Sequence, residues 1–382
     1  MRITGLRLQS FRNHSNSELE LGDGTNVLLG DNGQGKTNIL EAISYLCLTK
    51  SFYASTDSVV LTFDKEFFEI EGTAALENGQ ENQVRVVYDK RIPQKAFFIN
   101  RRSIEPFSSV IGKFPVVICS PEHAPITTGS PGERRKFVDL LISQSDNAYF
   151  KTLIEYRHVL KQRNKILFDA KLNGNDVTPL IEPWNEQLAN LGGFLMSRRK
   201  AFVGAFRPFL NSSYSSLAGE RENPQIEYLP TSATAEASTE AEFQGMLQSL
   251  IRDKVAEERR VGTSLAGPHR DEFAFMIDGL DMRKYASQGQ HKTFLVALKL
   301  AEFFYLKERC AETPILLLDD IFSELDELRS EGLLNFVGGI SQTFITSTGV
   351  QFLERAIEFG ERNRKFSIEK GCVKSHKVLA LS

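Results

Sequence analysis

The stretch Gly30-Asp31-Asn32-Gly33-Gln34-Gly35-Lys36-Thr37 decides the fold, because it matches the complete phosphate-loop pattern G-x-x-x-x-G-K-[ST]. It lies between the apolar run 26–29 and the helical stretch 38–43, as a loop joining a strand to a helix requires. Its glycines let successive backbone N–H groups approach a phosphate. Lys36 is expected to reach the β- and γ-phosphates, and Thr37 to ligand Mg²⁺. A glycine-rich turn that binds nothing is the alternative, but the complete pattern favours a nucleoside triphosphate site.

The composition describes an ordinary folded protein. The chain has 382 residues, of which 41% are hydrophobic and 25% charged, and this length suggests about two domains. The formal net charge is −3, so any binding to nucleic acid has to come from local basic patches. The four cysteines form no C-x-x-C pair, which argues against a disulfide framework or a zinc site. The sequence contains neither an apolar signal core nor a membrane-length apolar run, so we expect a cytoplasmic protein.

The N-terminal part is predicted to be rich in β-structure around one helix. Residues 3–8 and 17–21 alternate apolar and polar side chains, and we expect them to form an edge hairpin beside the phosphate-loop strand. Residues 67–76 and 83–88 alternate in the same way and are joined by an Asn-Gly turn at Asn78-Gly79.

The middle of the chain is predicted to be helical. One long helix is expected from about Asn147, and a further helical stretch from 184 to about 210. Pro208 is expected to kink or end that second stretch, so that 211–213 forms a loop. Thr239 and Glu242 have the spacing of a capping box and predict the start of another helix.

A second diagnostic element lies in the C-terminal third. Pro314-Ile315-Leu316-Leu317-Leu318-Asp319-Asp320 is an apolar run that ends in two acids, the pattern of a buried parallel strand with a Walker B site. Asp319 would belong to the Mg²⁺ shell, and Asp320 could orient the attacking water. The alternative is an apolar strand followed by a polar turn.

The spacing of the motifs separates this chain from compact phosphate-loop proteins. About 250 residues separate Thr37 from the stretch Ser287-Gln288-Gly289-Gln290, which precedes the Walker B strand. Ser323-Glu324-Leu325-Asp326 follows that strand. The order resembles that of ABC-type ATPases, in which a signature motif and a D-loop occupy these positions. A serine and a glycine at a helix N-terminus there approach the γ-phosphate held by the other subunit. Taken alone, the first stretch is explained equally well as a helix cap.

The chain closely resembles the RecF family, whose members are related to the heads of SMC proteins. The resemblance runs nearly end to end and is carried by Phe11-Arg12-Asn13-His14, residues 30–38, Gly129-Ser130-Pro131, residues 134–139, Gly267-Pro268-His269-Arg270-Asp271, residues 287–290 and residues 316–326. SMC heads usually have Glu where this chain has Asp320, which suggests slow hydrolysis. His291-Lys292 follows the signature where Gln-Arg is expected. Ser347-Thr348 occupies the switch position, where transporters carry His, so Thr348 is the residue to examine there.

The resemblance implies an α/β, ABC-type (SMC-head-like) P-loop ATPase with a mostly helical second lobe and no long coiled coil. Lobe I would comprise 1–118 and 308–382, with Walker A, Walker B and the D-loop. Lobe II, residues 119–307, would be a helical arm that carries the signature. The implied ATP-binding residues are Arg12, Gly30, Asp31, Asn32, Gly33, Gln34, Gly35, Lys36, Thr37 and Asn38. Lys36 and Asp320 would be catalytic, Thr37 and Asp319 would hold Mg²⁺, Asp326 would belong to the D-loop, and Ser287, Gln288, Gly289 and Gln290 would act in trans.

The resemblance also implies partners. The chain would dimerise on ATP, bind duplex DNA or the junction of duplex and single strand at a gap, and act with RecR and RecO to place RecA there, with links to replication restart and SOS induction. Its ATPase would be weak and stimulated by DNA. The candidate DNA contacts are Arg134, Arg135, Lys136, Arg157, Lys161 and Lys165, together with the run Arg198-Arg199-Lys200. For any one of these residues taken singly, a solvated helix face is the favoured explanation, and His269 is interpreted as a structural turn residue.

Two other functional classes remain as alternatives: the ATPase subunit of an importer and a small-molecule kinase. A transporter subunit should carry Leu-Ser-Gly-Gly in the signature and a switch histidine, and a kinase has no use for the motifs at 287–290 and 323–326. The sequence leaves open which DNA structure is preferred and whether hydrolysis loads or releases the protein.

Overall fold

The computed structural model describes residues 1–173, 178–231, 237–323, 325–349 and 351–375. The chain forms two compact units: unit 1 is Met1–Ala124, Ser212–Arg221 and Gln288–Ser382, and unit 2 is Pro125–Asn211 and Glu222–Ser287. This division differs from the predicted lobes, because residues 212–221 and 288–307 belong to unit 1 and not to the helical arm.

Two sheets form most of unit 1. Its strands are β1 (Arg2–Phe11), β2 (His14–Glu20), β3 (Thr25–Leu29), β4 (Phe67–Ala75), β5 (Glu81–Asp89), β6 (Gln94–Ile99), β7 (Arg102–Ser103), β8 (Val116–Cys119), β12 (Ile315–Asp319), β13 (Thr343–Ser347), β14 (Arg364–Glu369) and β15 (Cys372–Ser375). Within the described residues, the antiparallel sheet has the order β2-β1-β4-β5-β6-β7, and the second sheet the order β15-β14-β3-β13-β12-β8.

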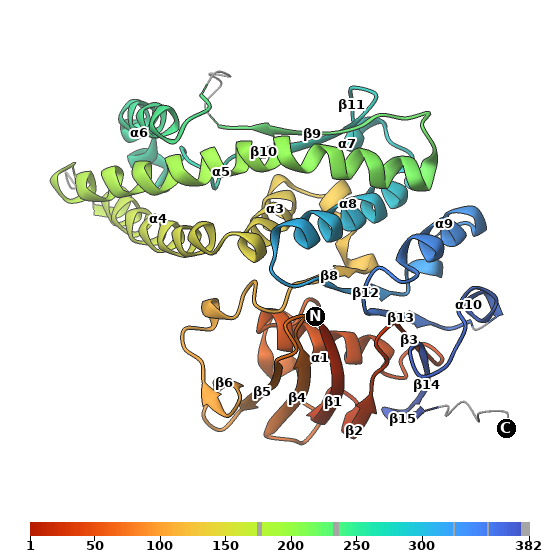
Figure 1. Cartoon of the computed structure of the whole chain (residues 1–382). Coiled ribbons are helices and arrows are strands. Elements are labelled where there is room, and N and C mark those ends of the chain that lie inside the picture. Colours follow the sequence, from red (N-terminus) through yellow and green to blue (C-terminus); the bar gives the residue numbers. More distant parts are fainter. Residues whose placement is uncertain (174–177, 232–236, 324, 350, 376–382) are drawn as a thin grey trace, which may run out of the picture. The chain divides into compact units, whose positions relative to one another are not determined.

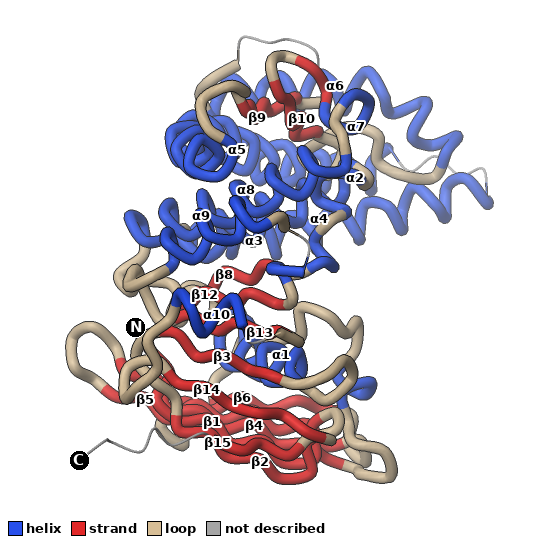
Figure 2. Tube along the Cα trace, turned by 90° about the vertical axis from the view of Figure 1, so that its right-hand side faces the viewer, coloured by secondary structure: helices blue, strands red, loops and turns tan. Residues whose placement is uncertain are grey.

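The helix that follows the phosphate loop lies between these two sheets. Helix α1 (Lys36–Leu48) contacts strands of both sheets (Figure 2), and its residues from Ile39 to Leu48 are buried. Tyr45 of this helix packs edge-on against Phe11 and Phe68 of the antiparallel sheet, with ring centroids 5.8 and 5.6 Å away. Such edge-to-face pairs stabilise the core beyond the area that they bury. The helix that starts at Lys36 is therefore fixed on both sides.

The second sheet brings the predicted motifs to one edge. Strand β3 pairs in parallel with β13 and β14, and β12 pairs in parallel with β13 and β8. All five residues of β3 and of β12 are buried, as the apolar runs predicted. The strands β8, β12, β13 and β3 lie side by side (Figure 1). The carboxyl ends of parallel strands meet at the same edge, so the phosphate loop after β3 and the acids at the end of β12 share that edge.

The predicted edge hairpin is confirmed, but its predicted place beside the phosphate-loop strand is wrong. Strands β1 and β2 do pair with each other, but they belong to the antiparallel sheet, where β1 also pairs with β4 over most of its length. Both edges of β3 are already occupied by β13 and β14. The hairpin of β4 and β5 is confirmed, and Gly79 in its turn has a φ of 83°.

Unit 1 also contains helices and short 3₁₀ helices. These are α8 (Gln288–Arg309), α9 (Glu327–Val337), α10 (Gln351–Ala356), η1 (Asp57–Val60), η2 (Phe107–Ser109), η3 (Pro121–His123) and η4 (Ile321–Ser323). Helix α8 packs on β8, and its residues from Thr293 to Phe303 are all buried. A helix therefore begins at the signature stretch, as both interpretations of that stretch require.

Unit 2 is mostly helical, as predicted. Its elements are α2 (Pro125–Thr128), α3 (Pro131–Ser145), α4 (Asn147–Asn173), α5 (Thr178–Ala218, the last residues in unit 1), β9 (Pro224–Leu229), α6 (Glu240–Val261), β10 (Glu272–Ile277), β11 (Leu280–Asp281) and α7 (Met282–Tyr285). The strands form a sheet of order β11-β10-β9. The capping box that begins α6 is confirmed: Thr239 accepts from the Glu242 N–H, and Glu242 accepts from the Thr239 N–H at 2.9 Å.

The predicted loop at 211–213 is wrong, because α5 continues through Pro208 to Ala218. A proline removes one helical hydrogen bond but leaves the rest of the helix able to pack. Leu210, Tyr214 and Leu217 are buried at helical spacing beyond the proline. Continued burial of this face outweighs the local cost of Pro208. No helix in the described part of the chain combines the length and apolar character that a membrane crossing requires.

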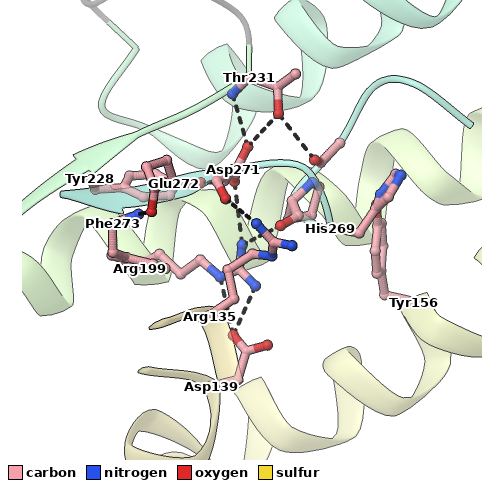
Figure 3. Close-up of polar contacts among 12 residues, drawn as sticks. Arg135, Asp139, Tyr156, Arg199, Tyr228, Thr231, His269, Asp271, Glu272 and Phe273 are labelled. Carbon is pink, nitrogen blue, oxygen red and sulfur yellow. Dashed lines mark hydrogen bonds and ion pairs between the residues drawn. The ribbon is translucent and has the colours of Figure 1, made fainter. Parts of the chain in front are cut away.

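A buried charged cluster joins the two sequence segments of unit 2. Arg199 of α5 lies between Asp139 of α3 and Asp271 before β10, at 2.8 and 3.3 Å (Figure 3). Asp271 also accepts from the Tyr228 hydroxyl and from the Thr231 N–H at 2.9 Å. The three charged side chains are at most 7% exposed, so one buried cation is shared by two buried carboxylates.

We predict that Arg199→Met destabilises unit 2 by about 3–5 kcal/mol, because it removes the buried counter-charge of Asp271 and leaves Asp139 with only the longer ion pair to exposed Arg157. Urea unfolding followed by the fluorescence of Trp184, the chain's one tryptophan, measures this change within α5. The neighbouring Arg198 is 53% exposed, and Arg198→Met should change stability by less than about 0.5 kcal/mol. Equal effects of the two substitutions would contradict a structural role for the cluster.

Candidate nucleotide site

The phosphate loop has the backbone shape that its glycines predict. It leaves β3 at Gly30 and ends at Gly35, the N-cap of α1, which has a φ of 110°. That backbone region is strained for residues with a side chain. A Cβ at Gly30 would also collide with the carbonyl oxygen of Ile368 on β14. The glycine at position 30 therefore lets the loop pack closely against β14 before α1 begins.

Lys36 lies inside this loop. Its Nζ donates to the carbonyl oxygens of Gly30 at 2.5 Å and Asp31 at 2.9 Å, and the residue is only 7% exposed. Burial lowers the pKa of the ammonium, and the negative charges of Asp320, Asp319 and Asp31 partly oppose that shift. The side chain is held where the loop closes, which is the position predicted for a phosphate-binding lysine.

Thr37 and the Walker B acids form one hydrogen-bonded group. The Thr37 hydroxyl donates to Asp319 Oδ1 at 2.8 Å, and the Thr346 hydroxyl at the end of β13 donates to the same oxygen at 2.8 Å. Thr346 Oγ1 in turn accepts from the Asp320 N–H at 2.8 Å. Burial raises the pKa of Asp319, and the two hydroxyl donors oppose that rise. The structure thus brings together the predicted metal ligands Thr37 and Asp319.

The donor set fits Mg²⁺. A threonine hydroxyl and a carboxylate are hard oxygen ligands, and Mg²⁺ is usually held by one or two such groups together with substrate phosphates. Among the described residues, no three His, Cys, Asp or Glu side chains gather as a separate metal cluster. Thr37 and Asp319 would therefore share Mg²⁺ with the phosphates of a nucleotide.

A hollow of about 490 Å³ opens beside the loop. The predicted residues that line it are Arg12, Asn32, Gly33, Gly35, Lys36, Thr37, Asn38 and Asp320. Asn13, Val59, Leu61 and Thr346 line it as well and were not predicted as site residues. The sequence offered a signal for Asn13, which lies inside a recognised motif. Val59 lies in η1 and Leu61 directly follows it, in a part of the sequence that no pattern marks.

Arg12 is held at the edge of this hollow by a buried carboxylate. Its Nε and Nη2 donate to the two oxygens of Glu41, each at 2.8 Å, and Glu41 is 1% exposed. The hydrogen bond with Glu41 raises the pKa of Arg12. Ser51 also donates to Glu41, and its hydroxyl accepts from the Tyr53 N–H at 2.8 Å. The guanidinium is therefore fixed in orientation by the helix that begins at Lys36.

The signature stretch lies at the start of a helix. Ser287 is the last residue of unit 2, and Gln288 begins α8, so Gly289 and Gln290 occupy its first turn. Ser287, Gln288 and Gly289 are exposed, and the Thr293 hydroxyl donates to the Gly289 carbonyl at 2.9 Å. Contact with a second subunit and a helix cap both stay predictions.

The two remaining motif positions lie after β12 and β13. Asp326 is the N-cap of α9, where it accepts from the Arg329 N–H at 2.9 Å. Glu324 lies outside the described residues. Thr348 and Asp320 line a second hollow of about 720 Å³, together with Ser347 and Phe352. Asp320 therefore borders both hollows.

The candidate DNA contacts of unit 2 separate into buried and exposed residues. Arg134 is 1% exposed and binds both oxygens of Glu272 at 2.9 Å, so its guanidinium is unavailable to DNA. Arg199 is equally buried, in the cluster described above. Arg135 is partly covered and donates to the Asp271 carbonyl at 2.5 Å. The exposed candidates are Lys136, Arg157, Lys161, Lys165, Arg198 and Lys200.

Comparisons with known proteins identify similar sequences over most of the chain. The sequence profile of the family described as "RecF/RecN/SMC N terminal domain" matches residues 2–373. The chain is 42% identical to the DNA replication and repair protein RecF of Chloroherpeton thalassium, over 91% of this chain and 95% of that one. It is 40% identical to the protein of the same name from Salinibacter ruber, over 90% of this chain and 84% of the other.

Solved structures give the same result. The recombination mediator protein RecF-ATP of the RecFOR pathway matches with a TM-score of 0.90 and 31% identity, over 98% of this chain and 97% of that one. An SMC head bound to the C-terminal winged-helix domain of ScpA matches with a TM-score of 0.55 at 12% identity, covering 99% of this chain and 98% of that one. This second likeness concerns the fold alone, and it supports the SMC-head-like class.

Proposed function

Because the chain belongs to the RecF family, we propose that it is an ATP-dependent DNA-binding protein of replication and recombinational repair. One observation carries the proposal: the Thr37 hydroxyl and Asp319 meet at 2.8 Å beside the loop that holds Lys36. A kinase or a transporter subunit could share that feature. The RecF relatives, which align with nine-tenths of the chain, favour a role in DNA repair.

In this proposal each group of the hollow has a separate task. The loop amides and Lys36 bind the phosphates, Arg12 lies at the far edge of the nucleotide, and Thr37 with Asp319 holds Mg²⁺. Bound Mg²⁺ supplies positive charge that offsets charge developing on the phosphates. Asp320 accepts a hydrogen bond from the attacking water and so orients it. Asp320 is one methylene shorter than the Glu usual in SMC heads, and we expect slow hydrolysis that acts as a switch.

The switch is proposed to operate between two copies of the chain. Ser287, Gly289 and the exposed first turn of α8 would approach the γ-phosphate held by the partner, and Asp326 would lie near the same interface. ATP would therefore favour dimers. The dimer would bind duplex DNA or a gap junction and cooperate with RecR and RecO in placing RecA, in the cytoplasm and with links to SOS induction.

We predict different losses for the two acids. Asp319→Asn should weaken Mg²⁺-dependent ATP binding about tenfold or more, because it replaces a charged metal ligand with a neutral one. Asp320→Asn should keep ATP bound and slow its turnover at least tenfold, because only the acceptor for water is weakened. Calorimetric titration with ATP and a phosphate-release assay measure the two effects. Equal loss of ATP binding in both variants would contradict the division of roles.

For DNA, we predict ATP-stimulated binding that weakens with salt. Lys161 and Lys165 are both exposed on α4, and each phosphate contact adds about 0.9 to the slope of log affinity against log salt. Lys161→Glu with Lys165→Glu should lower that slope by about two in fluorescence-anisotropy titrations. Lys90→Glu with Lys113→Glu makes the same charge change at exposed sites of unit 1 and is the matched control. If the slope falls equally in the control, these lysines act only through net charge.

A mixing experiment tests the composite site. Lys36→Ala and Ser287→Arg should each be inactive alone, but a mixed dimer pairs the intact loop of one chain with the intact signature of the other. Mixing should restore ATP-dependent dimers, seen by light scattering, and part of the ATPase activity. Full activity of Ser287→Arg at dilutions where it is monomeric would exclude the trans arrangement and favour the helix cap.

A further inference from the structure

The turn between β1 and β2 contacts the outer side of the phosphate loop. Asn13 Nδ2 donates to the Gln34 carbonyl oxygen at 2.9 Å, and Asn13 Oδ1 accepts from Asn38 Nδ2 at 2.8 Å. Asn13, in a turn of the antiparallel sheet, thus binds both the phosphate loop and the first turn of α1. A Cβ at Gly35 would collide with the Asn13 side chain, so the loop approaches the turn more closely than any other residue would allow.

His14, the residue after Asn13, contacts the phosphate loop at the Gly35 carbonyl oxygen. The ring is fully buried, with Nε2 3.0 Å from the Gly35 carbonyl oxygen and Nδ1 2.9 Å from Ser17 Oγ. A carbonyl oxygen only accepts hydrogen bonds, so Nε2 carries the hydrogen. Burial lowers the pKa of His14 and favours this neutral form. Ser17 Oγ also lies 2.9 Å from the Gly371 carbonyl, which ties the ring to the β14–β15 turn.

The β14–β15 turn contributes the third contact. The Gly371 N–H donates to the Gln34 carbonyl oxygen at 3.0 Å, and the Lys370 N–H donates to the Gln34 side chain at 2.6 Å. The carbonyl oxygens of Gln34 and Gly35 therefore both accept hydrogen bonds from the two turns that pack against the loop.

Peptide geometry gives these contacts a function. In a planar trans peptide, the C=O of one residue and the N–H of the next point in opposite directions. A Gln34 carbonyl held by Asn13 and Gly371 directs the Gly35 N–H the other way. A Gly35 carbonyl held by His14 directs the Lys36 N–H in the same manner. These are amides that a phosphate loop uses to bind the β-phosphate.

We propose that Asn13 and His14 are positioning residues that orient the phosphate-binding amides of Gly35 and Lys36. The inference rests on the proposed nucleotide site and deepens it. Donors that are already aimed at an anion lose less free energy when it binds than donors that have to be ordered first. Loss of the His14 contact should therefore weaken the binding of any triphosphate, whatever base it carries.

Two substitutions separate this role from simple packing. His14→Gln can place its amide nitrogen where Nε2 lies and keep the donor to Gly35. His14→Asn can place an amide nitrogen only near Nδ1, so the donor to Gly35 is lost. Calorimetric titrations with Mg²⁺ and two probes, ATP and inorganic tripolyphosphate, measure the affinity. We expect His14→Asn to bind both about tenfold more weakly and His14→Gln to remain within about threefold of the wild type.

The outcomes are distinguishable. Equal losses in both variants, or a loss for ATP without one for tripolyphosphate, would overturn the proposal, because neither depends on the donor to Gly35. A wild-type chain that binds no ATP would overturn the proposed nucleotide site itself. If either His14 variant fails to fold in a thermal unfolding control, Asn13→Ser replaces it, since serine is too short to reach the Gln34 carbonyl. Wild-type affinity in folded Asn13→Ser would also overturn the proposal.

Discussion

The hydrogen bond between Thr37 and Asp319 is the interaction on which the nucleotide site depends. The two residues are 282 positions apart: Thr37 lies in the first turn of α1, after the loop that leaves β3, and Asp319 ends β12. The strands β3 and β12 are not neighbours, because β13 lies between them. Thr346, at the end of β13, donates a hydrogen bond to Asp319 and accepts one from the Asp320 N–H. The intervening strand therefore takes part in the contact between the two halves of the site. A register slip of one residue in β13 would turn Thr346 to the other face and separate the two halves of the site.

Sequence reasoning predicted the parts of this site whose geometry is local. A phosphate loop needs glycines at fixed offsets and a strand on one side with a helix on the other, so Gly30 to Thr37 specify it without knowledge of the fold. The buried strand that ends in Asp319 and the capping box at Thr239 are local in the same sense. Each is encoded by residue types within fewer than ten positions, which is why the structure confirms these elements.

The features that sequence reasoning missed depend on partners far along the chain. Nothing in the alternation of β1 reveals that it pairs with β4 and not with β3. Arg134 and Lys136 are two residues apart in one basic run and look alike in sequence. Arg134 is buried against Glu272, which is 138 positions away in the sequence, whereas the side chain of Lys136 remains 71% exposed. Helix α5 passes Pro208 because residues beyond it are buried. In each case a tertiary contact outweighs the local preference.

The distribution of contacts around the phosphate loop bears on where the site can change its shape. The loop is continuous with β3, leads into a helix buried between two sheets, and is bound from outside by Asn13 and His14. This side therefore has little conformational freedom to lose when a nucleotide binds. The opposite side is more open: Asp320 has a φ of 51° and borders a second hollow that exposed Thr348 also lines. In the proposed switch, a rearrangement that follows the state of the γ-phosphate would therefore fall most easily on the residues after β12 and β13, because the contacts that Asn13, His14 and Gly371 make with the loop do not involve them.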